Sequence, residues 1–168
     1  MRRTLLLLPL LLLGCEQPPP KLAGSGMDMF APLKIRLHKL SRVVFPATAP
    51  ATAPASAPVA NVPVLEVHLE FSDQFGDAGK GIGDVTLQLF DAAVPMTVGK
   101  GPLLGTWNLS LDSPEQNRDH WDRTTRTYLF KLPLQNSLPR DHDHVTLTVA
   151  VTLPNRTTLT DELALPLK

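Results

Sequence analysis

The sequence has a single cysteine, Cys15, in 168 residues. A lone thiol forms neither an intramolecular disulfide nor a cysteine-based zinc site, so stability must come from an ordinary hydrophobic core. Aromatic residues are scarce at 5%, and neither sign of charge dominates, because 16 Lys and Arg balance 16 Asp and Glu. This balance gives no general electrostatic basis for binding DNA or RNA, and we expect no nucleic-acid partner.

Catalytic motifs are also missing. The sequence has no nucleophile elbow, no phosphate-binding glycine loop that follows a strand, and no paired-carboxylate motif. We therefore expect a protein that is not an enzyme and that needs no cofactor.

The N-terminal residues follow a recognisable order. Arg2 and Arg3 precede an apolar run over residues 5–13, and residues 12–15 read Leu-Leu-Gly-Cys. The run is roughly half the ~20 residues that a membrane-spanning helix needs. The segment resembles a bacterial lipoprotein signal peptide of type II. The resemblance implies a signal peptide over 1–14, lipidation of Cys15, export to the cell envelope, and attachment to the outer membrane in a host that has one.

Two further segments are rich in proline and contain little to bury. Residues 15–32 are expected to form a lipidated N-terminus and a flexible tether. Residues 47–58 repeat the pattern ATAP, ATAP, ASAP, which excludes helix and sheet. We expect residues 46–63 to form a disordered insertion or linker.

The intervening segment 33–44 has two interpretations. It is either part of the linker, with the domain starting near Val62, or the first strand of the domain, because apolar and basic residues alternate along it. In the second case the repeat is an insertion between two strands, which loop-closure entropy tolerates. We favour this interpretation and place the domain at 33–168. The basic residues of the segment would then either touch anionic lipid headgroups or lie against an acidic domain.

Short segments of alternating polarity follow, separated by turns rich in Gly, Asp and Pro. They are residues 65–71, 85–89, 104–109, 126–134, 145–153 and 157–165. A capping Ser113 and a first-turn Pro114 predict one short helix that ends near His120. We predict an all-β fold, a single antiparallel β-sandwich of about seven strands with one short helix in a crossover.

Residues 65–77 read LEVHLEFSDQFGD, so that a strand ends in Asp-x-x-Gly. This stretch resembles the second strand and turn of bacterial immunoglobulin-like and prealbumin-like sandwich modules. The resemblance implies a sandwich and carries no activity with it.

Two groups of residues are candidate metal ligands. Asp73, Asp77 and Asp84 could supply carboxylates to Ca²⁺, although Asp is also a common turn residue. His142 and His144 have strand spacing and could bind Zn²⁺ with His120 as a third ligand, although they equally suit a solvated turn.

A third group, Trp121, Asp122 and Arg126, combines a ring, a carboxylate and a guanidinium, which suits a carbohydrate, carboxylate or partner surface. The structural interpretation is that Asp122 pairs with a neighbouring arginine and that Trp121 fills the core.

The anchor, the tether and the sandwich favour a membrane-anchored envelope lipoprotein that acts as a non-catalytic protein-binding or assembly module. Its expected partners are the membrane, through the lipid, and an envelope protein. The alternative is a ligand-capture lipoprotein that binds a metal ion or a glycan through the histidine group or the Trp121 group.

Overall fold

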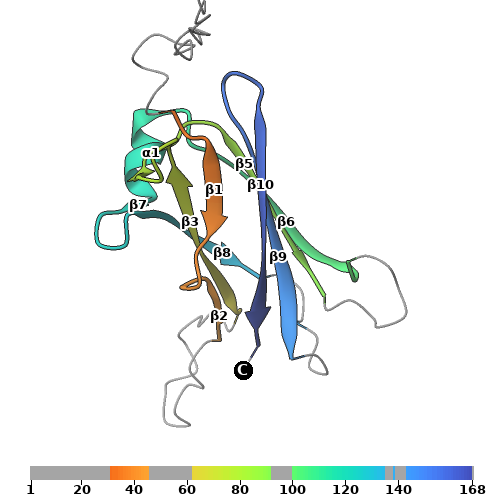
Figure 1. The fold of residues 1–168 in the computed structure, drawn as a ribbon. Helices are drawn as coiled ribbons and strands as arrows, with labels where there is room; N and C mark the ends of the chain where they lie inside the picture. Colours follow the sequence, from red (N-terminus) through yellow and green to blue (C-terminus); the bar gives the residue numbers. More distant parts are fainter. Residues whose placement is uncertain (1–30, 46–61, 92–99, 135–137, 139–142, 168) are drawn as a thin grey trace, which may run out of the picture.

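The computed structural model describes residues 31–45, 62–91, 100–134, 138 and 143–167, which form two packed antiparallel sheets (Figure 1). This arrangement confirms the predicted all-β sandwich. The leader, Cys15, most of the tether, the ATAP repeat and His142 lie outside the described residues.

The first sheet, called sheet A, is organised around one long strand. In spatial order it contains β1 (Lys34–Leu37), β3 (Val64–Ser72), β8 (Thr127–Pro133) and β7 (Trp121–Asp122). Two more short strands, β2 (Arg42–Val44) and β4 (Ala78–Gly79), also pair with β3. The second sheet, sheet B, contains four longer strands in the order β10 (Thr158–Pro166), β9 (His144–Thr152), β5 (Asp84–Phe90) and β6 (Leu103–Ser110).

The core lies between the sheets and follows from the alternation of apolar residues along the strands. Inward-facing side chains of the central strands are almost fully buried. They are Leu65, Val67, Leu69 and Phe71 on β3, Tyr128, Phe130 and Leu132 on β8, Val85, Leu87 and Leu89 on β5, and Val145, Leu147, Val149 and Val151 on β9.

The segment 33–44 lies in sheet A as two strands instead of the single strand predicted. A turn at residues 39–40 separates β1 from β2, and both pair antiparallel with β3. Two of its basic side chains form ion pairs with β3, Arg36 with Glu70 at 3.0 Å and Arg42 with Glu66 at 2.9 Å. For Arg36 and Arg42, the structure therefore supports the interpretation in which the basic residues lie against acidic residues of the domain.

The sandwich is closed along one side by contacts between its two sheets. There β10, the edge strand of sheet B, lies beside β1 (Figure 1). The backbone N–H of Leu37 donates to the Asp161 carboxylate on β10 at 2.6 Å.

The predicted helix is confirmed as α1 (Pro114–Asp119), which connects sheet B to sheet A after β6. Ser113 is its N-cap, and its hydroxyl accepts the backbone N–H of Gln116 at 3.1 Å. Pro114 occupies the first turn, where its missing N–H has no cost. The helix is anchored by the Asn117 amide, which donates to the carbonyls of Gly81 and Leu111.

Candidate functional site

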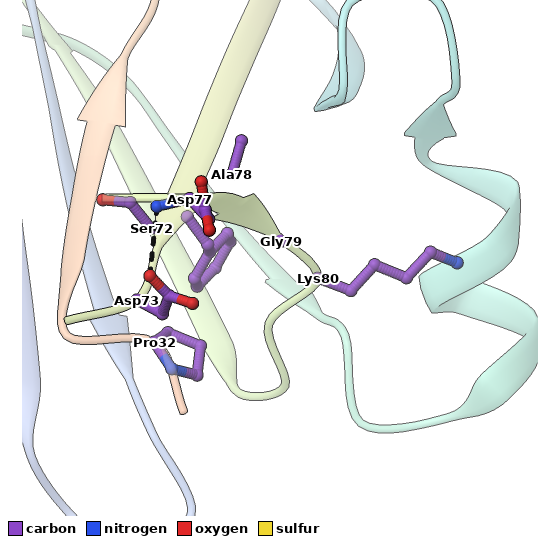
Figure 2. Close-up of a pocket in the computed structure, with 8 residues that line it drawn as sticks. Pro32, Ser72, Asp73, Asp77, Ala78, Gly79 and Lys80 are labelled. Atoms are coloured by element: carbon purple, nitrogen blue, oxygen red, sulfur yellow. Dashed lines mark hydrogen bonds between the residues drawn. The ribbon is translucent and has the colours of Figure 1, made fainter. Parts of the chain in front are cut away.

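The acidic turn between β3 and β4 borders a surface hollow of about 350 Å³. Asp73, Asp77 and Lys80 line it together with Pro32 (Figure 2). One oxygen of Asp73 accepts the backbone N–H groups of Phe75 and Asp77, at 2.8 and 3.0 Å. Asp73 therefore builds the turn, as Asp commonly does.

The three calcium candidates are not gathered at this hollow. Asp84 lies at the start of β5 in sheet B, opposite Ser110 and Thr152. Among the described residues, no three His, Cys, Asp or Glu side chains form a group suited to a metal ion. The structure thus does not assemble the calcium site drawn from Asp73, Asp77 and Asp84.

The histidine group is only partly described. His144 is exposed at the first position of β9 and pairs with Pro166, while His142 lies outside the described residues. His120 lies elsewhere, as the C-cap of α1. The centroid of its ring is 4.8 Å from that of Phe130, and its Nδ1 atom is 3.4 Å from the carbonyl oxygen of Leu129. His120 therefore has local contacts of its own, on the side of sheet A.

The Trp121 group lies on a tight hairpin between β7 and β8. Asp122 accepts the backbone N–H of Thr124 at 2.8 Å and the hydroxyl of Thr125 at 2.9 Å. The Thr124 hydrogen bond is the main reason why the pKa of Asp122 is lowered. The expected pairing of Asp122 with an arginine is replaced by these turn contacts, because the hairpin brings Thr124 and Thr125 closer.

Arg126 and Trp121 also serve the structure of this hairpin. Arg126 has a positive φ of 57° and donates from Nη2 to the carbonyl of Ala78 at 2.7 Å, which ties the hairpin to β4. The centroids of the Trp121 ring and the buried Tyr128 ring are 5.1 Å apart. The Lys80 ammonium lies 5.5 Å from the centroid of the Trp121 ring. Nevertheless, His120, Trp121 and Asp122 border a common surface hollow of about 370 Å³.

A chain of polar side chains that the sequence pattern does not predict lies in sheet A, with His68 and Thr127 buried and Thr125 and Asp122 half-buried. The alternation along β3 predicts a solvent-exposed His68, but this side chain is only 9% exposed. The Nδ1 atom of His68 lies 2.9 Å from the Thr127 hydroxyl. The Thr127 hydroxyl lies 2.8 Å from the Thr125 hydroxyl, and the Thr125 hydroxyl donates to the Asp122 carboxylate. Burial lowers the pKa of His68 below 6.5, and the nearby Asp122 carboxylate opposes this shift.

The outer faces of the two sheets differ in charge. That of sheet A carries the Arg36 and Arg42 ion pairs and Lys131 near Glu66. On sheet B the outward positions hold mainly short uncharged side chains, which we call the threonine face. Its members are Thr86, Gln88, Thr106, Asn108, Ser110, Thr146, Thr148, Ala150, Thr152, Thr158 and Thr160.

Strand pairing arranges the threonine face as rows. One row across β10, β9, β5 and β6 is Thr160, Ala150, Thr86 and Asn108. In the next row Thr148, Gln88 and Thr106 are followed on β10 by the charged Glu162, at the border of the face. The small Ala150 leaves a shallow hollow of about 390 Å³ there. Lys100 and Glu162, 2.9 Å apart, form an ion pair at its rim.

The outer edge of β6 borders this face. The Leu111 N–H bonds to the Gly83 carbonyl, so by antiparallel alternation Leu109 and Trp107 also bond to β5. The backbone groups of Thr106, Asn108 and Ser110 therefore point away from the sheet. These three residues, which we call the β6 edge, have no backbone partner on that side within the described structure.

In comparisons with known proteins, no family model, no curated protein and no solved structure matches this chain. Among the described residues, no helix is long and apolar enough to cross a membrane.

Proposed function

We propose that this chain is a membrane-anchored lipoprotein of the cell envelope, and that its sandwich binds protein without catalysis of its own. The observation that carries the proposal is the combination of the threonine face and the open β6 edge on one sheet. A surface of short uncharged side chains can be desolvated at a lower cost than a surface of charges. The charged outer face of sheet A is the less suitable of the two.

The polar groups elsewhere support a binding role over a catalytic one. Asp73, Asp122 and Arg126 each form hydrogen bonds that hold a turn in place. Their polar atoms are thus used to position backbone. The leader pattern at residues 12–15 supports the anchor, because a lipid on Cys15 would hold the sandwich at a membrane surface.

The anchor is tested with a Cys15→Ser variant in cells grown with a labelled fatty acid. We expect the wild-type chain to take up the label and to sediment with membranes. The variant should remain unlabelled and unprocessed. An equal label on both chains would contradict acylation at Cys15.

Protein binding is tested by placing a photo-reactive amino acid at Thr148 on the threonine face and, as a control, at Lys131 on sheet A. Irradiation of intact cells should give a defined cross-linked protein band from position 148 and none, or a different one, from position 131. Identical adduct patterns from the two positions would contradict the assignment of the binding surface to sheet B.

A second candidate is supported by the hollow beside His120, Trp121 and Asp122. A half-buried tryptophan next to a carboxylate suits a sugar ring, which stacks on the indole and donates hydroxyl hydrogen bonds. Melting curves with chito-oligosaccharides, Ca²⁺, Zn²⁺ or a chelator test this alternative, because a ligand that binds only the folded state raises its stability. A rise that Trp121→Ala abolishes would support ligand capture, and unchanged melting would contradict it.

A further inference from the structure

We infer that the β6 edge pairs with the β6 edge of a second copy of this chain, so that sheet B continues across a two-fold axis at Asn108. The inference rests on the proposed function and names its partner. The protein-binding surface would be, at least in part, a self-association surface.

The first observation is that the β6 edge lacks the usual protection of an edge strand. Strands at sheet edges are normally protected by charge, proline, a bulge or a covering segment. Residues 103–110 read LLGTWNLS and contain neither a charged residue nor a proline. The register irregularity falls between the pairs Leu89–Gly105 and Phe90–Leu103, at the start of β6, and the pairing is regular from Gly105 to Ser110.

The opposite edge of the same sheet is protected in three ways. Within β10, Asp161 is a charge on the inner face, and Pro166 ends the strand. In addition, β1 lies beside β10 and bonds to Asp161 (Figure 1). The edge strand on the other side of sheet A, β7, has only two residues. The contrast makes β6 the long unprotected edge of the described sandwich.

The second observation is that the β6 edge is self-complementary. Its outward backbone groups belong to Thr106, Asn108 and Ser110, which are evenly spaced about Asn108. An antiparallel copy centred there places Asn108 opposite Asn108 and Thr106 opposite Ser110 of the second copy. Each such pair exchanges two backbone hydrogen bonds, so every outward donor of these residues finds an acceptor.

The side chains agree with the same register. On the outer face the facing residues are amides and hydroxyls, so no like charges meet. On the inner face the register places Trp107 opposite Leu109 of the second copy. Both are only partly buried in the single chain. Pairing would cover them further, and aromatic–aliphatic cross-strand pairs stabilise sheets.

Disulfide trapping in membranes of cells that express the full chain tests this register. In the wild-type chain Cys15 is the only thiol, and acylation would block it. In Asn108→Cys the two new thiols face each other across the axis. Facing residues of a hydrogen-bonded pair have Cα atoms about 5.5 Å apart, within the range of a disulfide. We expect oxidation to convert most of this variant into a covalent dimer.

Thr106→Cys is the matched control, because its thiols would lie four residues out of register, about 13 Å apart along the strand. On its own it should form no disulfide-linked dimer, and it should become covalently linked only when co-expressed with Ser110→Cys. That co-expressed pair also provides a second test if Asn108→Cys folds poorly. Equal cross-linking of Asn108→Cys and Thr106→Cys would overturn the register.

Charge provides an independent measurement. Asn108→Lys places two ammonium groups opposite each other, so we expect the dimer of the detergent-solubilised full chain to weaken by about tenfold or more in sedimentation experiments. Thr160→Lys adds the same charge to the same face at the opposite edge and should leave association unchanged. A wild-type chain that is monomeric at all tested concentrations would overturn the inference.

Failure of this inference and failure of the proposed function give different results. Cross-linking of Asn108→Cys to a different protein would overturn the second copy as partner and leave protein binding in place. A symmetric dimer from a chain whose Cys15 carries no lipid would support the edge pairing and contradict the membrane anchor.

Discussion

Single polar side chains hold the loops of this protein against its sheets. Tyr128 is the clearest case, because its ring is fully buried and its hydroxyl accepts the Gly81 N–H at 3.1 Å. The same hydroxyl lies 3.0 Å from the Gly81 carbonyl and from the Asn117 side-chain oxygen. Burial raises the pKa of Tyr128, so the phenol keeps its proton and can donate it to one of these acceptors.

Removal of this hydroxyl in Tyr128→Phe is expected to lower the free energy of unfolding by about 1–3 kcal/mol, because the Gly81 N–H loses its acceptor in a buried place. Urea denaturation measures the change. Thr158→Val, which removes an exposed hydroxyl from the threonine face, should change stability by less than about 0.5 kcal/mol. Similar effects of the two substitutions would show that the Tyr128 contacts add little.

His68 gives the protein a pH-dependent stability. Its pKa in the folded state is lowered below 6.5 by burial, so the unfolded chain binds a proton at this position more readily. The stability that neutral His68 contributes is therefore fully present above about pH 6.5 and is lost as the pH falls below that value. Neighbouring charges that act on it are Asp122, His38, Glu66 and Arg42.

We expect His68→Asn, whose amide can still bond to Thr127, to lose less stability between pH 7 and pH 5 than the wild-type chain. Urea midpoints at several pH values measure this difference. His144→Asn, the same substitution at an exposed position on β9, is the matched control. Parallel profiles for the wild-type and His68→Asn chains would exclude a contribution from His68.

At the scale of the elements, the turn into β5 depends on one glycine. Gly83 has a positive φ of 150°, and a Cβ atom there would collide with the Thr152 carbonyl of β9. Gly79, on β4, has open space around the position of a Cβ atom.

Gly83→Ala is therefore expected to destabilise the fold by about 1–3 kcal/mol, whereas Gly79→Ala should change stability by no more than about 1 kcal/mol. Thermal melts of both variants test this prediction. A Gly83→Ala chain as stable as the wild type would mean that β9 moves away at little cost.

The longer strands could be predicted because apolar residues alternate strictly along them, as at Leu65 and Val67 on β3. The short elements could not. Strands β4 and β7 have two residues each, so pairing with a neighbour defines them and no periodicity exists to detect. His68 follows the exposed parity of β3, and its burial depends on residues distant in sequence, such as Thr127, whose hydroxyl lies 2.9 Å from its ring nitrogen.

The candidate sites were harder to predict for a related reason. Asp73, Asp122 and Arg126 have side chains that suit both ligand binding and turn formation, and the sequence contains no information about which use prevails. The structure resolves this through hydrogen bonds to nearby backbone atoms. The β6 edge was missed because the openness of a strand edge depends on sheet order, which local patterns do not encode.

For the molecule as a whole, strand pairing brings the two ends of one connection together. Val44 at the end of β2 lies directly opposite Val64 at the start of β3. The chain between them, which contains the ATAP repeat, therefore leaves and returns at neighbouring points. We therefore expect its contribution to stability to be the entropy of closing a loop, which varies with the logarithm of loop length.

Deletion of one repeat unit, residues 51–54, should therefore change the free energy of unfolding by only about 0.2 kcal/mol, in the stabilising direction. Urea denaturation of the full chain measures this effect, with an insertion of a second ATAP unit as the matched opposite change. A loss above about 1 kcal/mol on deletion would show that the repeat contacts the sandwich. The small, opposite effects expected here would instead show that the repeat acts on stability only through the length of the connection.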